Sequence, residues 1–449
     1  MLLERDSELE LLDDLLINLR SSGGKVVLIR GEAGIGKTSL VREFLATHAD
    51  DLHAHMGGCD DLLIPQPFAP FWDMARIEPS LKGPLDDADR PRLLEAVRDL
   101  LSRSLRPTVI VIEDTHWADD ATLDAIKYLG RRIATANGLL VLTYRTGELD
   151  YDHPLRGVFG DLPGQDVVRI QLSGLSLPAV SSIVSNVNLD PEAVLAATKG
   201  NPLLVKEMVS SDGAVIPSSL QDSVMARVRK LSPGAQQILK TLAVIPEPIP
   251  TMDALGLSGA SESRLDECER RGLLDVGSEM VGFRHELTRR AVEAALTGSE
   301  RLARNRAVLK DLPEETHPCL IIHCSVEAND VDRLMVVAPR SARYAAAMGS
   351  HHEAVGDFRQ LAPHLDRLDL EDRGTLLVEW AREEFLVDNM SEAIRLNEAA
   401  LSHYRATGDR RAESRVLAQA AHVYENAGQR EQAERLARQA VDVLGDDPD

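Results

Sequence analysis

One eight-residue loop constrains this chain more than any other feature of its sequence. Gly31–Thr38 reads GEAGIGKT and matches the pattern G-x-x-x-x-G-K-T. It follows a short run rich in β-branched residues, Lys25–Arg30, and opens a predicted helix at Lys37–Leu45. In that context the glycines let backbone N–H groups curl around phosphate oxygens. The loop therefore predicts a parallel α/β sheet that binds a nucleotide at the start of the chain.

The loop also supplies most of the predicted binding residues. We expect Lys37 to place its charge against the β- and γ-phosphates and Thr38 to reach Mg²⁺ with its hydroxyl. A chance glycine-rich turn is the alternative, and the strand–loop–helix order argues against it. The expected cofactors are ATP or ADP with Mg²⁺. The other predicted nucleotide contacts in this segment are Gly31, Glu32, Ala33, Gly34, Ile35, Gly36 and Ser39.

Two acids follow the second clear strand, Thr108–Ile112. At the carboxyl end of a strand beside a phosphate loop, Glu113 suits Mg²⁺ coordination and Asp114 suits orientation of an attacking water. A solvated acidic turn is the alternative. Arg145 closes the third predicted strand, Gly138–Tyr144, where it could sense the γ-phosphate through charge-assisted hydrogen bonds. Arginines at strand ends are also common on protein surfaces.

The order of predicted elements divides the 449 residues into several domains. Alternating strands and helices over residues 1–150 predict a P-loop nucleotide-binding domain, with its ligand at the carboxyl edge of a parallel sheet. Residues 151–215 read as a helical subdomain, interrupted at 199–202. Helices followed by two short strands, near 273–276 and 280–284, predict a winged-helix domain over 216–299. Residues 300–449 read as a helical arm.

This arm contains a repeat. Ala354, Ala393 and Ala433 occupy similar contexts 39 and 40 residues apart, each at the start of a predicted second helix. Helix pairs that stack through small residues are typical of tetratricopeptide repeats, which have a period of about 34 residues. The longer spacing indicates a divergent, TPR-like version.

Composition excludes several other classes of protein. Acidic residues outnumber basic ones by 72 to 50, a formal charge of −22 that repels nucleic-acid backbones. The four cysteines are scattered, as in proteins of a reducing compartment. The N-terminus has no signal-peptide pattern, and no apolar run approaches the ~20 residues that span a bilayer. We therefore expect a cytoplasmic protein without a membrane partner.

A second possible site lies in the arm. His317, Cys319, His323 and Cys324 invite a zinc interpretation, but their spacing is not that of a standard finger. Core packing beside neighbouring apolar residues is the better interpretation.

Several segments that occur in one order resemble a known family. They resemble the signal-transduction ATPases with numerous domains, the STAND class of AAA-type P-loop ATPases. Within that class the chain is most similar to the large ATP-binding LuxR-type transcriptional regulators, related to the maltose-regulon activator. The resemblance is strong over residues 1–300 and loose over the repeats. Its segments are LLERDSELELL, GEAGIGKTSLVREF, VIVIEDTHWADDATL, VLTYR, KGNPLLVKE and FRHELTRRAV.

This resemblance implies a switch that rests with ADP, exchanges it for ATP when an inducer binds the repeat arm, self-associates and hydrolyses ATP slowly. It implies that Pro202 of the GNP sequence packs on adenine and that His285 reads the β-phosphate of ADP. The chain departs from the family in having Glu113 where Asp is commoner. It also lacks a C-terminal helix-turn-helix, so DNA contact would need a domain outside this chain.

Two alternatives belong to other classes. A P-loop enzyme such as a small-molecule kinase would need a substrate pocket and lid, which the HWAD and GNP sequences and the repeats do not provide. A non-hydrolysing interaction scaffold would not need the intact Lys37, Thr38, Glu113 and Asp114.

Overall fold

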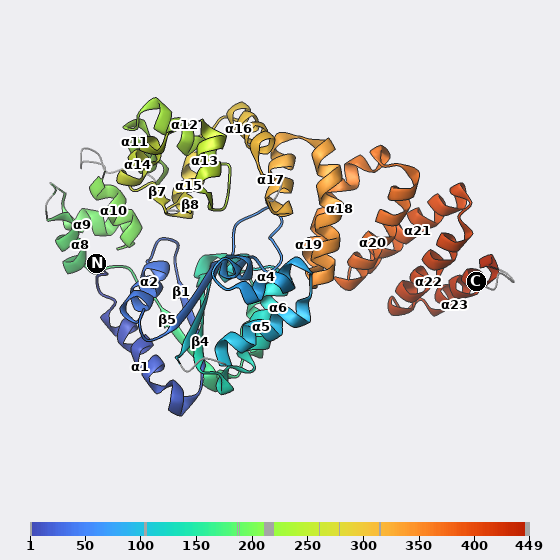
Figure 1. Cartoon of the computed structure of the whole chain (residues 1–449), viewed down its shortest axis with the longest axis horizontal. Coiled ribbons are helices and arrows are strands. Elements are labelled where there is room, and N and C mark those ends of the chain that lie inside the picture. The colour runs from blue at the N-terminus through green and yellow to red at the C-terminus, as the bar shows by residue number, and fades with distance from the viewer. Residues whose placement is uncertain are drawn as a thin grey trace. The chain divides into compact units, whose positions relative to one another are not determined.

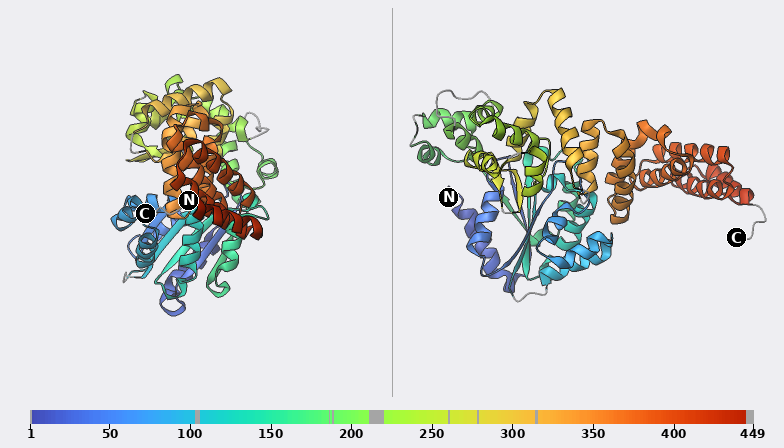
Figure 2. Two further views of the ribbon diagram at one scale, coloured as in Figure 1. Left: turned by 90° about the vertical axis from the view of Figure 1, so that its right-hand side faces the viewer. Right: turned by 45° about the horizontal axis from the view of Figure 1, so that its top comes forward.

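The computed structural model describes residues 2–102, 106–185, 187, 189–210, 220–259, 261–277, 279–313 and 316–444. The chain divides into two compact units, Met1–Thr316 and His317–Asp449, which are described separately (Figures 1 and 2). The first unit contains both sheets. No helix within the described ranges is long and apolar enough to cross a membrane.

A five-stranded parallel sheet lies at the centre of the first unit, in the order β2-β3-β4-β1-β5 (Figure 1). Its inner strands β1, β3 and β4 consist largely of fully buried apolar residues, as their unbroken apolar runs predict. The edge strands β2 and β5 were not predicted from the sequence. The strand bounds are β1 Lys25–Gly31, β2 His53–Gly58, β3 Thr108–Glu113, β4 Gly138–Arg145 and β5 Val167–Gln171.

The parallel sheet extends beyond residue 150, the predicted end of the nucleotide-binding domain. Strand β5 pairs with β1 along Val26–Arg30, so the sheet is complete only at Gln171. The strand is short and partly exposed, and it follows a 3-10 turn, Gly164–Asp166. A short edge strand of mixed polarity gives a weak periodic signal, which explains why β5 was not predicted.

Helices cover both faces of this sheet (Figures 1 and 2). On one side α1 and α2 bury Leu12, Leu40 and Phe44 against the strands. Gly23 caps the end of α1 with a φ of 71°, and its N–H donates to the Leu19 carbonyl. The bounds are α1 Asp6–Ser22, α2 Lys37–Thr47, α3 Ala69–Ala75, α4 Pro79–Asp86, α5 Arg90–Ser102, α6 Asp120–Gly130 and α7 Pro154–Asp161, with 3-10 turns η1 Thr115–Trp117, η2 Ile133–Thr135, η3 Thr146–Glu148 and η4 Gly164–Asp166.

Three short helices follow the sheet: α8 (Leu177–Val184), α9 (Pro191–Thr198) and α10 (Pro202–Ser210). They share a core that includes Val180 and Val205. Lys199 and Gly200 both have positive φ angles, 50° and 72°, which breaks the helical path at the predicted interruption.

The remainder of the first unit combines helices with a small antiparallel sheet of order β6-β8-β7. Strands β7 and β8 confirm the two predicted short strands, and Ser232 caps α12 as its Ser-Pro sequence predicts. We call α11 to β8 and α15 the α11–α15 module. Its elements are α11 Leu220–Arg229, α12 Pro233–Leu242, β6 Ile249–Pro250, α13 Thr251–Ser258, α14 Glu262–Arg270, β7 Leu274–Val276, β8 Met280–Phe283 and α15 Glu286–Ala294.

The second unit is a succession of paired helices. Helix α16 (Gly298–Asp311) belongs to the first unit, and the second unit begins at His317. The three repeated alanines are buried at equivalent places near the starts of α19, α21 and α23. The elements are α17 Pro318–Ala328, α18 Val331–Met348, α19 His351–Leu361, η5 Ala362–Arg367, α20 Leu370–Leu386, α21 Met390–Thr407, α22 Arg410–Asn426 and α23 Arg430–Leu444.

Candidate functional site

The predicted phosphate loop joins the carboxyl end of β1 to the first turn of α2. Gly34 and Gly36 adopt φ angles of 77° and 104°, in the left-handed region that favours glycine. A side chain at Gly34 would put its Cβ 2.7 Å from the Cβ of Leu203, so α10 packs directly on the loop. The loop therefore adopts the backbone conformation that its glycines permit, and it packs directly against α10.

Lys37 is held inside this loop. Its side chain is 7% exposed, and its Nζ donates to the carbonyl oxygens of Gly31 and Glu32, each at 3.2 Å. Burial lowers the pKa of Lys37, and the nearby Asp114 carboxylate opposes that shift. The ammonium group is thus positioned where the loop would surround a phosphate.

The two acids predicted to act in the site lie at the end of β3. Thr143 of β4 fixes the turn that follows, because its hydroxyl accepts from the backbone N–H of Asp114 at 3.0 Å. Its carbonyl accepts from the Thr115 hydroxyl, also at 3.0 Å. Asp114 itself has a φ of 50°, a conformation that aspartate tolerates better than most residues.

Glu113 has the properties of a cation ligand. Its Oε1 atom is buried and makes no hydrogen bond. Burial raises the pKa of Glu113 to about 7, while a hydrogen bond from Thr38 lowers it. A buried carboxylate oxygen without a partner, next to a hydroxyl, fits the oxygen-ligand preference of Mg²⁺.

Arg145 also comes into the site. It is 5% exposed, and its guanidinium lies 2.8 Å from a carboxylate oxygen of Glu148 in η3 and 3.7 Å from one of Asp114. The sheet register explains the proximity, because Arg145 lies opposite Gly31, the first residue of the phosphate loop. Glu148 was not predicted as a site residue.

The residues of the HWAD sequence make different contacts. Asp119 is structural: its carboxylate caps α6 through the Thr122 N–H at 3.0 Å and accepts from the Phe68 N–H at 3.1 Å. Burial lowers the pKa of His116 to about 3, and the positive charge of Arg145 contributes to this shift. The ring is therefore neutral at pH 7. Trp117 presents its ring to the Arg145 guanidinium, whose carbon lies 4.3 Å from the ring centroid.

Two residues from outside the sheet hydrogen-bond to the backbone of the phosphate loop. Asn201 of the GNP sequence donates from Nδ2 to the Ala33 carbonyl at 2.8 Å. Arg5, 4% exposed, donates to the Ile35 carbonyl at 3.3 Å and the Ser173 carbonyl at 2.7 Å. Neither was predicted as a site residue, although both lie in segments that carry the family resemblance. The predicted adenine contact, Pro202, follows Asn201 at the start of α10.

His285 lies at the N-cap position of α15, where its side chain makes no capping hydrogen bond. Burial lowers its pKa to about 4, and the positive charges of Arg284, Lys206, Arg227 and Arg42 add to this effect. The imidazole is therefore neutral at pH 7 in surroundings that favour an anion. Arg42 belongs to α2, the helix that begins at the phosphate loop.

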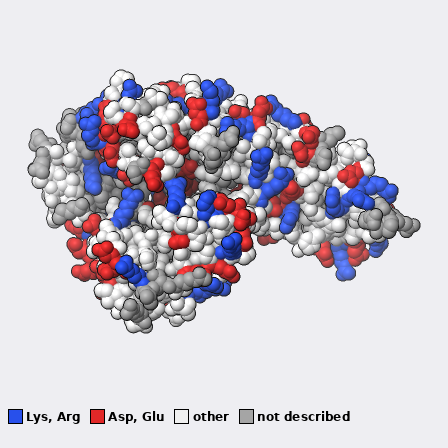
Figure 3. All heavy atoms as spheres, in the orientation of Figure 1, with Lys and Arg blue, Asp and Glu red and all other residues white. Residues whose placement is uncertain are grey.

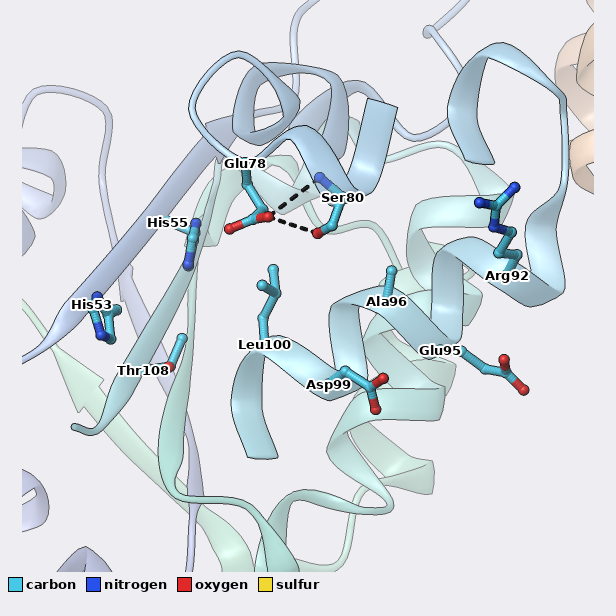
Figure 4. Close-up of a pocket in the computed structure, with 10 residues that line it drawn as sticks. All are labelled: His53, His55, Glu78, Ser80, Arg92, Glu95, Ala96, Asp99, Leu100 and Thr108. Carbon is cyan, nitrogen blue, oxygen red and sulfur yellow. Dashed lines mark hydrogen bonds between the residues drawn. The ribbon is translucent and has the colours of Figure 1, made fainter. Parts of the chain in front are cut away.

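A separate cavity of about 570 Å³ lies between β2, α4 and α5, lined by residues that include His53, His55, Glu78 and Asp99 (Figure 4). His53 is the first residue of β2 and pairs with Thr108, the first residue of β3. The cavity is therefore at the amino ends of these strands, opposite the edge that carries the phosphate loop.

The possible zinc residues of the arm lie in or beside α17. Cys319 and Cys324 are buried, and His317 caps the helix through the Leu320 N–H at 3.4 Å. Throughout the described part of the chain, no three His, Cys, Asp or Glu side chains are grouped so that they could hold a metal ion.

Part of the chain matches a known protein family. Residues 1–142 match the family described as the AAA ATPase domain. An uncharacterized protein of Rhizobium meliloti (strain 1021) is 24% identical over 442 residues, an alignment that includes 81% of this chain but only 42% of that protein. The chain thus spans less than half the length of this curated relative.

Among solved structures, one similar fold is that of a STAND protein with a tetratricopeptide repeat sensor from Pyrococcus horikoshii. The two are 15% identical with a TM-score of 0.51, over 96% of this chain and 76% of that one. A Walker-type ATPase of Pyrococcus abyssi also matches, at 16% identity and a TM-score of 0.36 over 65% of this chain and 96% of that one. The chain therefore begins with an AAA ATPase domain and has a fold similar to that of a STAND ATPase.

Proposed function

We propose that this chain is an ATP-dependent signal-transduction switch, resting with ADP and active with ATP. The observation that carries the proposal is the set of hydrogen bonds between the start of α10 and the backbone of the phosphate loop. Asn201 donates to the Ala33 carbonyl, and the Leu203 N–H donates to the Gly34 carbonyl at 3.3 Å. A helix that touches the loop backbone from outside the sheet can respond to what the loop binds, which a rigid catalytic pocket does not require.

Each residue of the nucleotide site has a proposed role. Lys37 and the loop N–H groups would hold the phosphates. Thr38 and Glu113 would hold Mg²⁺, which would supply positive charge to neutralise charge that develops on the phosphates. Asp114 orients the attacking water and accepts its proton. Arg145 responds to the γ-phosphate by exchanging its carboxylate partners for it. Pro202 packs on adenine, and His285 contacts the β-phosphate of ADP.

The resting state requires the α11–α15 module, proposed to be a winged helix, to stay against the nucleotide domain. The repeat arm, proposed to be TPR-like, receives a small-molecule or protein inducer. Release of the module then allows ADP to leave, ATP to bind and copies of the chain to associate. Slow hydrolysis resets the switch.

The family resemblance extends this proposal to the sensing part of a LuxR-type transcriptional regulator. The acidic net charge supports a division in which this chain does not read DNA itself. On the face shown in Figure 3, basic side chains are interspersed with acidic ones rather than gathered in a stripe.

The test compares the wild-type chain with Asp114→Asn by phosphate release and by light scattering after size exclusion. We expect turnover far below the ~1–100 per second of kinases. We expect a further fall of about 10²–10⁴-fold in the variant, because an amide is a poor base. Larger assemblies should form with ATP but not ADP and should persist in the variant. Rapid turnover, or assembly indifferent to nucleotide, would contradict the proposal.

A further inference from the structure

The Trp117 ring contacts two arginines from different parts of the first unit. One is Arg145, at the end of β4, with its guanidinium carbon 4.3 Å from the ring centroid. The other is Arg290 of α15, whose guanidinium carbon lies 5.4 Å from the same centroid. Both distances are within the range of cation–π attraction. A half-buried tryptophan therefore joins the nucleotide domain to the α11–α15 module.

Arg290 is anchored by charge as well as by the ring. Its guanidinium pairs with Asp61, in the loop after β2, and its Nε lies 3.2 Å from Glu286 on its own helix. This neighbourhood is rich in carboxylates: burial raises the pKa of Asp60 well above its usual range, and the charges of Glu247 and other nearby acids raise it further. Arg290 offsets this like-charge repulsion where the module meets the nucleotide domain.

Arg145 is the arginine of this pair that lies beside the phosphate loop, because it is opposite Gly31 in the sheet. Its present partners are Glu148, at 2.8 Å, and Asp114, at 3.7 Å. A γ-phosphate beside Lys37 would compete with those carboxylates for the same guanidinium. Any movement of Arg145 toward it would remove one of the two cations that hold the Trp117 ring.

We propose that Trp117 is a positioning residue that transmits the state of Arg145 to Arg290, so that docking of the α11–α15 module depends on occupancy of the γ-phosphate position. The inference rests on the proposed switch function and names the contact through which the nucleotide site controls the module. Because a ligand shifts an equilibrium only through differential contacts, loss of this contact should favour the undocked state and ATP.

Trp117 is itself the probe, since its fluorescence can be isolated by subtracting the emission of Trp117→Phe from that of the wild type. We expect a non-hydrolysable ATP analogue with Mg²⁺ to change this difference emission and ADP with Mg²⁺ to leave it nearly unchanged. Arg290→Gln should show altered emission without nucleotide. Identical nucleotide-free emission in wild type and Arg290→Gln would overturn the inference, even with normal nucleotide affinity.

Affinities provide the second readout. Arg290→Gln should shift the ratio of ADP to ATP-analogue dissociation constants about two- to fivefold toward the analogue, the equivalent of one cation–π contact. Arg290→Lys, which keeps the Asp61 pair but lacks a planar guanidinium, should lie between.

The matched control is Asp275→Asn. It removes the exposed Arg42–Asp275 pair, 3.6 Å apart, which also joins the module to the nucleotide domain but does not involve Trp117. This variant should leave the ratio unchanged. Equal shifts in both variants would mean that docking is sensed without Trp117 and would overturn the inference. A wild-type chain that binds neither nucleotide would overturn the proposed function as well.

Discussion

The two units treat their buried charges differently. In the first unit, buried ionisable groups of both signs meet at the carboxyl edge of the sheet, and Glu113 keeps an oxygen without a hydrogen bond. In the second, Glu384 is fully buried but accepts from the Trp380 indole at 2.9 Å, the Arg359 guanidinium at 3.0 Å and the Asn389 amide at 2.7 Å.

This difference distinguishes buried groups that could bind a ligand, in the first unit, from a buried group that only stabilises the fold, in the second. The partners of Glu384 come from its own helix α20, from α19 and from the N-cap of α21, so Glu384 links these three helices without any ligand. The groups around Lys37 are satisfied only in part by the chain, which leaves capacity for phosphate and a cation. Burying incompletely paired charges costs stability, and such arrangements concentrate at functional sites.

The largest effect expected of a single substitution is that of Lys37→Ala. Removing a buried, phosphate-paired charge should weaken ATP and ADP binding by about 2–5 kcal/mol, enough to abolish measurable affinity. Titration calorimetry with each nucleotide measures the loss. Lys25→Ala is the control, because Lys25 is at the opposite end of the same strand, paired with Asp166 at 2.8 Å. Unchanged affinity in Lys37→Ala would contradict the site assignment.

Asp357 is an exception to this difference between the units. It is a buried carboxyl of the second unit with poorly satisfied hydrogen-bonding capacity. It is 1% exposed, and neither oxygen makes a hydrogen bond of good geometry. Burial raises its pKa to about 7 from 3.8, against a smaller lowering by the Ser341 hydroxyl. Between these pH values the folded state keeps a proton that the unfolded chain has lost, so the free energy of unfolding should fall as pH rises.

We expect this fall to be about 2–4 kcal/mol between pH 4 and pH 8, and to be absent in Asp357→Asn. Trp380 is the only tryptophan of the second unit. Urea unfolding can therefore be followed through its emission in a Trp72→Phe, Trp117→Phe background. Asp366→Asn is the control, since that side chain is 93% exposed. An unchanged slope with pH in Asp357→Asn would show that this carboxyl is ionised in the folded arm.

Asn201→Ala tests whether the contact between α10 and the phosphate loop matters energetically. The side chain donates to the Ala33 carbonyl and accepts from the Leu203 N–H at 3.1 Å. Its loss should cost about 1–2 kcal/mol of nucleotide affinity and of first-unit stability, as expected for a buried cap. Calorimetry and thermal unfolding measure both. Asn18→Ala removes an exposed bond within α1, at 2.8 Å, and should change neither.

Local patterns predicted the centre of this molecule, whereas its edges and long-range contacts were missed. Inner strands β1, β3 and β4 follow from continuous apolar runs, but β2 (HAHMGG) is a polar, glycine-containing edge strand without such a signal. The loop residues and the two acids are adjacent in sequence to predicted strands. Asn201 and Ala33 are 168 residues apart, so their contact appears only once the chain is folded.

The same limit applies to His285, whose predicted role depends on the resemblance rather than on spacing. A simple helix-cap histidine is the alternative, but the side chain makes no capping bond and lies among four cationic residues. If it contacts the β-phosphate of ADP only when the module is docked, His285→Ala should weaken ADP more than ATP. We expect a difference of about 1 kcal/mol, roughly fivefold, the value of one neutral hydrogen bond.

The pH dependence of ADP binding provides a second, independent test of the role of His285. Without nucleotide the pKa of His285 is about 4. A phosphate beside the ring would raise it, so ADP binding would take up a proton and tighten as pH falls toward that range. The wild type should show this trend in ADP dissociation constants between pH 8 and pH 5, and His285→Ala should lose it. His53→Ala, exposed at the amino end of β2, is the control. An equal loss of affinity for both nucleotides, with the pH trend intact, would leave His285 as a structural residue of α15.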